Sequence, residues 1–315
     1  MPAAPELALT TDLTDAYPEW RELRAALHAG DWPTARALIT GQPPSTQTGL
    51  IGQADAEPDI RPMVQRQVDA DPADAVAAAL LGYLMIHQAW QVRTSARAKH
   101  VSRSQFRTFH EILRAAELML IDAAAHQPGD CSIWAARLIT ARGLQLGQSE
   151  ARRRYDRLAE QDPHHLPAQE LLLQQLCPKW GGSFDEMHTF ARECAAAAPE
   201  GALNGSLIAQ AHFEHLVELN SWEQTKYATT EVKEEVRMAA ARSVLHADFR
   251  PTYGWIDAAS QFAMVQSLLG DHAAAAPHFA ALGNRVSKDV WGRFDDPVAM
   301  FAEFRRKALA AGGRR

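Results

Sequence analysis

Three segments decide the fold of this chain: AELMLIDAAAHQP at residues 116–128, ARRRYDRLAEQDP at 151–163 and MHTFARECAAAAP at 187–199. Each segment places its key residues at one shared spacing that ends on a proline: Ala116, Leu120, Ala123, Pro128; Ala151, Tyr155, Leu158, Pro163; Met187, Ala191, Cys194, Pro199. Successive prolines fall 35 and 36 positions apart. That period is close to the roughly 34 residues of a tetratricopeptide repeat.

Each position in the repeat has a physical reason. Residues three and four apart share a helix face, small side chains let a neighbouring helix approach, and proline ends the helix because it cannot continue the hydrogen-bond ladder. Each hairpin then exposes an apolar face that only the next hairpin can cover. Helix-favouring residues dominate the chain, and strand patterns are nearly absent. We therefore expect an all-α fold, a tetratricopeptide-like, right-handed superhelical array of stacked helical hairpins.

A turn motif extends the array toward both ends of the chain. It occurs as Gly30-Asp31-Trp32 followed by Ala35 and Ile39, and as Gly270-Asp271-His272 followed by Ala275 and Phe279. The glycine suits the position that follows a helix, where a left-handed backbone is favoured. These copies place helical hairpins from about Tyr17 to Arg306.

The polar segment 40–58, rich in Pro and Gly, interrupts the repeats and predicts a loop or a mobile lid. We therefore expect an N-terminal hairpin with this loop at 1–58, a helical-repeat domain at 59–308 and a flexible tail at 309–315.

Composition narrows the function classes. The 315 residues carry a formal net charge of −6, with no overall excess of Lys and Arg, so we expect no nucleic-acid binding. The three cysteines form no CxxC pair, which argues against a disulfide framework and a cysteine zinc site. The N-terminus lacks the pattern of a signal peptide, and no later apolar run approaches the length that spans a bilayer. We expect a cytoplasmic protein that contacts no membrane.

Two further runs carry a resemblance to a known family. Residues 176–183 read LCPKWGGS and residues 211–215 read AHFEH, and together they resemble an uncharacterised bacterial family of tetratricopeptide-like proteins with a Lys-Trp-Gly-Gly-Ser motif. The resemblance covers most of residues 90–304. It implies the same helical-repeat fold and no particular reaction. Where members carry an Arg-Gly pair after the Trp90 position, this chain has Arg93-Thr94-Ser95.

Positive charge gathers in one segment of this acidic chain. Spacings of four place Arg93 with Arg97, and Arg103 with Arg107, on shared helix faces. One reading is a solvated helix face. The other is a binding surface for carboxylate or phosphate groups, because guanidinium groups bind such anions bidentately. The arginines at 152–154 could extend this surface.

The Lys179–Ser183 run lies between two expected helices. Paired glycines favour a turn with Trp180 buried as its anchor, and Ser183 could cap the next helix. Alternatively, the backbone amides of this run beside Lys179 would form an anion site at a helix N-terminus.

His212, Glu214 and His215 fall on an expected helix, with the two histidines on one face. Metal ligation needs such spacing, but no HExxH or Glu-x-x-His partner set completes a site, so we predict no metal. The eight tryptophans recur about once per hairpin and are expected to be core anchors.

The chain shows no complete catalytic set, so we expect an interaction protein that holds a peptide or a partner protein, acidic where it meets the arginines, in a concave groove. We expect no cofactor. The alternative is an enzyme or a small-molecule binder, with a pocket where Lys179–Ser183, Arg142 and His212–His215 meet.

Overall fold

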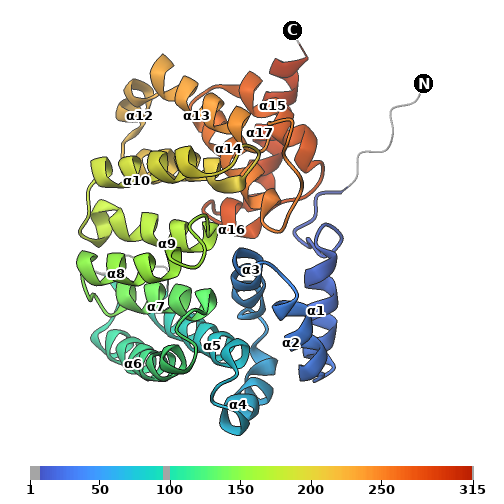
Figure 1. The fold of residues 1–315 in the computed structure, drawn as a ribbon. Coiled ribbons are helices and arrows are strands. Elements are labelled where there is room, and N and C mark those ends of the chain that lie inside the picture. Colours follow the sequence, from blue (N-terminus) through green and yellow to red (C-terminus); the bar gives the residue numbers. More distant parts are fainter. Residues whose placement is uncertain (1–7, 95–99, 314–315) are drawn as a thin grey trace. The chain divides into compact units, whose positions relative to one another are not determined.

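The computed structural model describes residues 8–94 and 100–313, which form helices joined by turns and loops (Figure 1). Within these residues no strand occurs, and Thr10 and Arg285 form an isolated β-bridge. The expected all-α class is confirmed.

The chain forms two compact units, at boundaries that differ from the expected divisions at residues 58 and 308. Pro18–Ser183 is the N-terminal unit, and Met1–Tyr17 together with Phe184–Arg315 is the C-terminal unit. Backbone bonds attach the described start of the chain to the C-terminal unit. The Thr10 N–H donates to Asn284 O at 2.9 Å, and the Val286 N–H donates to Thr10 O at 2.8 Å. The Ile256 N–H donates to the Tyr17 hydroxyl at 3.0 Å.

The N-terminal unit consists of helices that follow one another with short connections: α1 (Pro18–His28), α2 (Trp32–Thr40), α3 (Pro44–Ala54), the 3₁₀ turn η1 (Pro58–Ile60), α4 (Arg61–Ala70), α5 (Ala75–Arg93), α6 (Arg103–His126), α7 (Cys131–Gly143), α8 (Gln148–Ala159), α9 (Leu166–Leu176) and η3 (Pro178–Trp180).

The C-terminal unit contains α10 (Phe184–Ala197), η4 (Leu203–Gly205), α11 (Ser206–Leu216), α12 (Ser221–Tyr227), α13 (Thr230–Arg242), α14 (Trp255–Leu268), α15 (His272–Leu282), α16 (Lys288–Trp291) and α17 (Pro297–Gly312). Because α17 continues through Gly312, the expected tail at 309–315 is wrong for residues 309–312.

The expected loop at 40–58 is also wrong, because α3 occupies most of it. Pro44 stands at the start of α3, where its missing N–H leaves no helix bond unmade. Leu50, Ile51 and Ala54 lie on a buried face, and the Thr48 hydroxyl is 2.8 Å from that of Ser132. This apolar spacing outweighs the Pro- and Gly-rich composition.

The repeat positions behave as expected. The apolar members of the three segments are all buried: Ala116, Leu120, Ala123, Ala151, Tyr155, Leu158, Met187, Ala191 and Cys194. They lie on α6, α8 and α10, and each helix ends before the proline of its segment. The spacing of small and large residues therefore marks the buried faces of these three helices.

The turn motif is confirmed at both of its copies. Gly30 and Gly270 have φ of 71° and 73°, and the following Asp31 and Asp271 donate their N–H groups to carbonyls five residues earlier. The same bond closes the end of α7, where Gln145 takes the glycine's place with φ of 56°. The sequence gives no sign of this third copy because it lacks the glycine.

Helix α5 contradicts the expectation that no apolar run approaches the length that spans a bilayer. Among the described helices it is the one whose length and composition suffice to cross a membrane. Most of its residues are buried inside the N-terminal unit, against α4, α6 and α7. That burial is typical of the core helix of a globular unit.

Candidate binding surfaces

One exposed face of α6 carries a continuous row of residues, which we call the α6 stripe. Its members follow spacings of three and four, so they lie along a single line of the helix surface: Arg103, Arg107, His110, Arg114, Leu118 and Ile121. The row measures about 27 Å at a rise of 1.5 Å per residue. Leu118 is 70% exposed and Ile121 is 44% exposed. The stripe is basic in its first half and apolar in its second.

The charges of the α6 stripe are not neutralised within the described part of the chain. Arg103, Arg107 and Arg114 are exposed, and no described carboxylate forms an ion pair with them. Unpaired like charges along one helix face repel weakly, by a few tenths of a kcal/mol per pair. Folding alone therefore gives no reason for this arrangement.

The two other arginines of the expected basic surface stand apart from the stripe. Arg93 ends α5, and its guanidinium lies over the rings of Trp90 and Phe106, at 5.3 and 5.8 Å from the ring centres. Arg97 lies outside the described residues.

The arginines at 152–154 do not extend this surface. Arg152 pairs with Asp156 on its own helix, and Arg153 pairs with Glu150. Arg154 is buried and bonds to Glu117. Sequence position alone does not distinguish these three, because their partners are set by the face of α8 on which each one lies.

The Lys179–Ser183 run forms a tight turn that begins with η3. The N–H groups of Trp180, Gly181 and Gly182 donate to the carbonyls of Cys177 and Pro178, so these amides are used within the turn. A side chain at Gly182 would collide with the backbone of Leu176. These contacts favour a structural turn over an anion site. Lys179 is exposed, and Ser183 is half-buried.

Trp180 is half-buried and not the buried anchor that we expected. Its ring meets Trp90 edge-on, with 6.2 Å between centroids, and the Arg142 guanidinium lies 5.8 Å from its centroid. The side-chain N–H groups of Gln148 and Gln175 donate to the Trp180 carbonyl at 3.1 and 3.3 Å. The turn is thus fixed by its backbone, and the indole is a secondary contact.

Three histidines meet in the C-terminal unit, where sequence spacing predicted two. His212 and His215 lie on α11 as expected, and His188 reaches them from α10. His188 Nε2 lies 3.2 Å from His215 Nδ1, and the His188 and His212 rings are 4.8 Å apart. Phe184 stacks on His215 at 3.8 Å.

Two further residues complete this histidine cluster. His212 Nδ1 is 2.7 Å from the Tyr227 hydroxyl, and His212 Nε2 is 3.1 Å from Glu235 Oε2. A carboxylate only accepts hydrogen bonds, so His212 donates from Nε2 to Glu235. Arg192 holds Glu235 from the other side at 2.6 Å. No sequence signal marks His188, Tyr227 or Glu235, because they are 15–39 positions from their partners.

The surroundings of the cluster disfavour the charged forms of His188 and His215. Burial, together with the neighbouring His212 and His215, lowers the pKa of His188 to about 3. Burial and His212 also lower the pKa of His215. The hydrogen bond from His212, together with Arg192, lowers the pKa of Glu235 to about 2. Burial raises the pKa of Tyr227.

The structure divides the residues of the expected small-molecule pocket between the two units. Glu214 is buried and pairs with Arg293 at 3.3 Å. Lys179–Ser183 and Arg142 belong to the N-terminal unit, whereas His212 and His215 belong to the C-terminal unit. Neither unit by itself contains the small-molecule pocket that we expected from these residues.

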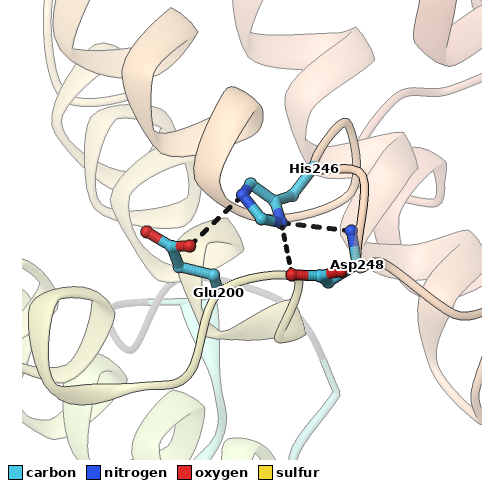
Figure 2. A group of neighbouring side chains, drawn as sticks. All are labelled: Glu200, His246 and Asp248. Carbon is cyan, nitrogen blue, oxygen red and sulfur yellow. Dashed lines mark hydrogen bonds and ion pairs between the residues drawn. The ribbon is translucent and has the colours of Figure 1, made fainter.

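A separate group of possible metal ligands lies on the C-terminal unit, where Figure 2 shows His246 between Glu200 and Asp248. His246 Nε2 is 3.4 Å from Glu200 Oε2, and the Asp248 N–H donates to His246 Nδ1 at 3.2 Å. Since Nδ1 accepts this bond, the proton of the neutral ring sits on Nε2 and faces Glu200. The three side chains therefore form a hydrogen-bonded cluster on the C-terminal unit.

Comparison with known proteins adds no relative: no protein-family model matches the chain, and no curated protein matches it.

Proposed function

We propose that the chain is a cytoplasmic, tetratricopeptide-like interaction protein whose α6 stripe binds an acidic, amphipathic helix of a partner protein. The observation that carries the proposal is the stripe itself, in which arginines that form no ion pair with any described carboxylate precede exposed Leu118 and Ile121 on the same face. The resemblance to the Lys-Trp-Gly-Gly-Ser family agrees with the repeat architecture.

Charge complementarity selects an acidic partner. Carboxylates placed opposite Arg103, Arg107 and Arg114 would replace the weak repulsion along the stripe with charge-assisted hydrogen bonds. Guanidinium groups suit this role because they present planar, bidentate donors.

The apolar half of the stripe selects an amphipathic partner. Leu118 and Ile121 are one turn apart, so a partner helix can cover both with side chains at its own i, i+3 and i+4 positions. This arrangement places the partner on α6, the second helix of its hairpin, instead of on the first helices that we expected to line a groove.

The test is a selection of helical peptides of about 20 residues, a length that matches the stripe at 1.5 Å per residue. Surface positions are randomised among acidic, basic, polar and apolar residues. We expect the selected peptides to carry acids at one end and apolar residues at the other. Their affinity should fall at least tenfold for Arg107→Glu/Arg114→Glu and for Leu118→Asp, and it should fall as salt rises.

The matched control is Arg21→Glu/Arg66→Glu, which reverses two exposed charges elsewhere on the N-terminal unit. It should leave the affinity within about twofold. A selection without binders, binders without acidic enrichment, or equal losses in both double variants would each contradict the proposal.

A further inference from the structure

A cavity of about 680 Å³ opens between α10 and α13 in the C-terminal unit. Both helices pack on α11. Their mutual contacts show that they run in the same direction beside the cavity. Arg192 of α10 pairs with Glu235 of α13, and Arg242 at the end of α13 donates to the carbonyls of Ala196 and Ala198 at the end of α10.

Small apolar side chains create this cavity. Its lining includes Ala195, Ala198, Ala202, Ile208, Met238 and Ala239. Alanines on facing helices leave a space that larger side chains would fill. Met238 is 64% exposed, and its flexible thioether can adapt to an occupant. The volume falls within the roughly 300–1,000 Å³ that is typical of small-molecule sites.

Two polar contacts bound the cavity lengthwise. Glu235 and Arg242 are seven residues apart on α13, which corresponds to about 10 Å along the helix. At the first contact, Arg192 and Glu235 neutralise each other. At the second, the charge of Arg242 faces the C-terminal carbonyls of α10, which carry the negative end of that helix's dipole.

Two further negative charges lie near the Arg192–Glu235 contact and are less well matched. Glu231 and Glu234 both line it, and both are exposed. Glu231 has no ion-pair partner among the described residues, and its carboxylate accepts hydrogen bonds from its own N–H and from the Thr229 hydroxyl. Glu234 shares Arg237 with the buried Asp271, which lies 2.6 Å from that guanidinium against 3.3 Å for Glu234. The cavity therefore combines an apolar body with an excess of negative charge at one end.

We infer that this cavity binds a small cationic amphiphile, an apolar amine whose chain lies between α10 and α13 and whose ammonium group meets Glu231 and Glu234. A carboxylate would face repulsion at that end, and at the other end it would compete with the carbonyls of Ala196 and Ala198 for the guanidinium of Arg242. Charge and shape thus select the same class of ligand.

The test is calorimetric titration of the full chain, below micelle-forming concentrations, with three probes of equal chain length: octylammonium, octanol and octanoate. We expect octylammonium to bind one per chain, more tightly than octanol, and octanoate to bind weakest. Glu231→Gln/Glu234→Gln should weaken octylammonium binding at least tenfold and leave octanol binding unchanged. The matched control, Glu193→Gln/Glu218→Gln, removes two exposed acids of the same unit that do not line the cavity.

A second pair of variants tests the apolar part. Ala195→Phe fills the cavity and should abolish binding of octylammonium and octanol. Because Ala195 is buried, Met238→Trp at the exposed mouth provides a filling variant that leaves the core packing intact. Binding of none of the three probes, octanoate binding as tight as octylammonium binding, or an equal loss in the control double variant would overturn the inference.

Discussion

Arg154 and Glu117 form a buried ion pair between successive hairpins, with Nη2 2.9 Å from Oε1 and side-chain exposures of 3% and 9%. Arg137 donates to the same carboxylate oxygen at 3.0 Å, and the Thr140 hydroxyl donates to the other oxygen. One carboxylate of α6 therefore binds α7 and α8 at once. Several hydrogen bonds to one buried charge offset much of the cost of removing that charge from water.

Glu117→Ala should lower the free energy of unfolding by about 3–5 kcal/mol, because it leaves the buried guanidinium of Arg137 without a carboxylate and leaves the buried Arg154 with Glu150 alone. Urea denaturation measures this change. The control is Arg152→Ala, which breaks an exposed pair on α8 and should cost less than about 1 kcal/mol. Similar losses in the two variants would show that the buried network contributes no more than a surface pair.

Acid should destabilise the histidine cluster. The pKa of His188 is lowered in the folded chain, so between pH 6.5 and 4.5 the unfolded chain binds more protons than the folded one. The stability that His188 provides is therefore complete above pH 6.5 and is lost as the pH falls toward 3. The dependence is at most about 1.4 kcal/mol per pH unit for one proton.

His188→Gln removes this titration, so its stability should fall less steeply than that of the parent chain over pH 6.5–4.5. Glu235, whose pKa is lowered to about 2, acts mainly below this window. Denaturant titrations at three pH values provide the measurement. Parallel pH profiles for the variant and the parent would contradict the assignment.

The turn after α7 provides a test of backbone strain. Gln145 is exposed and has φ of 56°, a conformation that glycine adopts without penalty. Gln145→Gly should therefore raise the free energy of unfolding by up to about 1 kcal/mol. Gly30→Ala is the reciprocal control, because a methyl group there meets no atom within 4 Å and acts through φ of 71° alone. It should destabilise the chain by a similar amount, and changes of the same sign in both variants would refute the explanation.

The α6 stripe makes a prediction about stability as well as binding. Arg103→Gln/Arg107→Gln should leave the melting temperature level or raise it slightly, because the change removes a repulsive i, i+4 pair. Arg36→Gln should instead melt lower, since Arg36 lies 3.2 Å from the buried carboxylate of Asp74. A lower melting temperature for the α6 double variant would indicate that its arginines stabilise the fold.

Trp180→Ala should cost about 2 kcal/mol, less than the roughly 3–5 kcal/mol expected for a fully buried tryptophan. In the parent chain the Trp180 ring contacts Trp90 and Arg142 but is only half-buried, so its removal exposes less apolar surface than the loss of a core tryptophan. Trp222→Ala, at a ring that is 66% exposed, should stay within about 0.5 kcal/mol. Chemical denaturation followed by circular dichroism compares the two, and a loss above about 4 kcal/mol would place Trp180 in the core.

Local spacing predicted the parts of the fold that depend on near neighbours in sequence. The positions of Ala116, Leu120 and Ala123 fix a buried helix face because they lie within two turns of one helix. Composition misled at 40–58, where Leu50 and Ile51 pack a helix although prolines and glycines surround them. The energy that orders this segment comes from tertiary burial, which composition does not record.

The candidate surfaces were predictable to different degrees. The basic half of the α6 stripe was predictable, because spacing alone places Arg103 and Arg107 on one face. The apolar half was not, because the exposure of Leu118 depends on which side of α6 packs against α5 and α7. The cavity between α10 and α13 was not visible, because alanines such as Ala195 read equally well as tight packing. The distance between α10 and α13 depends on how each of them packs against α11, which the sequence does not show.

The chain path through residues 8–17 has a consequence for synthesis on the ribosome. Thr10 and Tyr17 bond to Val286 and Ile256, which are translated more than 200 residues later, whereas Pro18–Ser183 can pack as soon as it emerges. During synthesis, Thr10 and Tyr17 therefore cannot form these hydrogen bonds until more than half of the chain has been made. A fusion partner or a truncation at the N-terminus should accordingly disturb the C-terminal unit. The helices that directly follow residue 17 in sequence belong to the N-terminal unit and should stay intact.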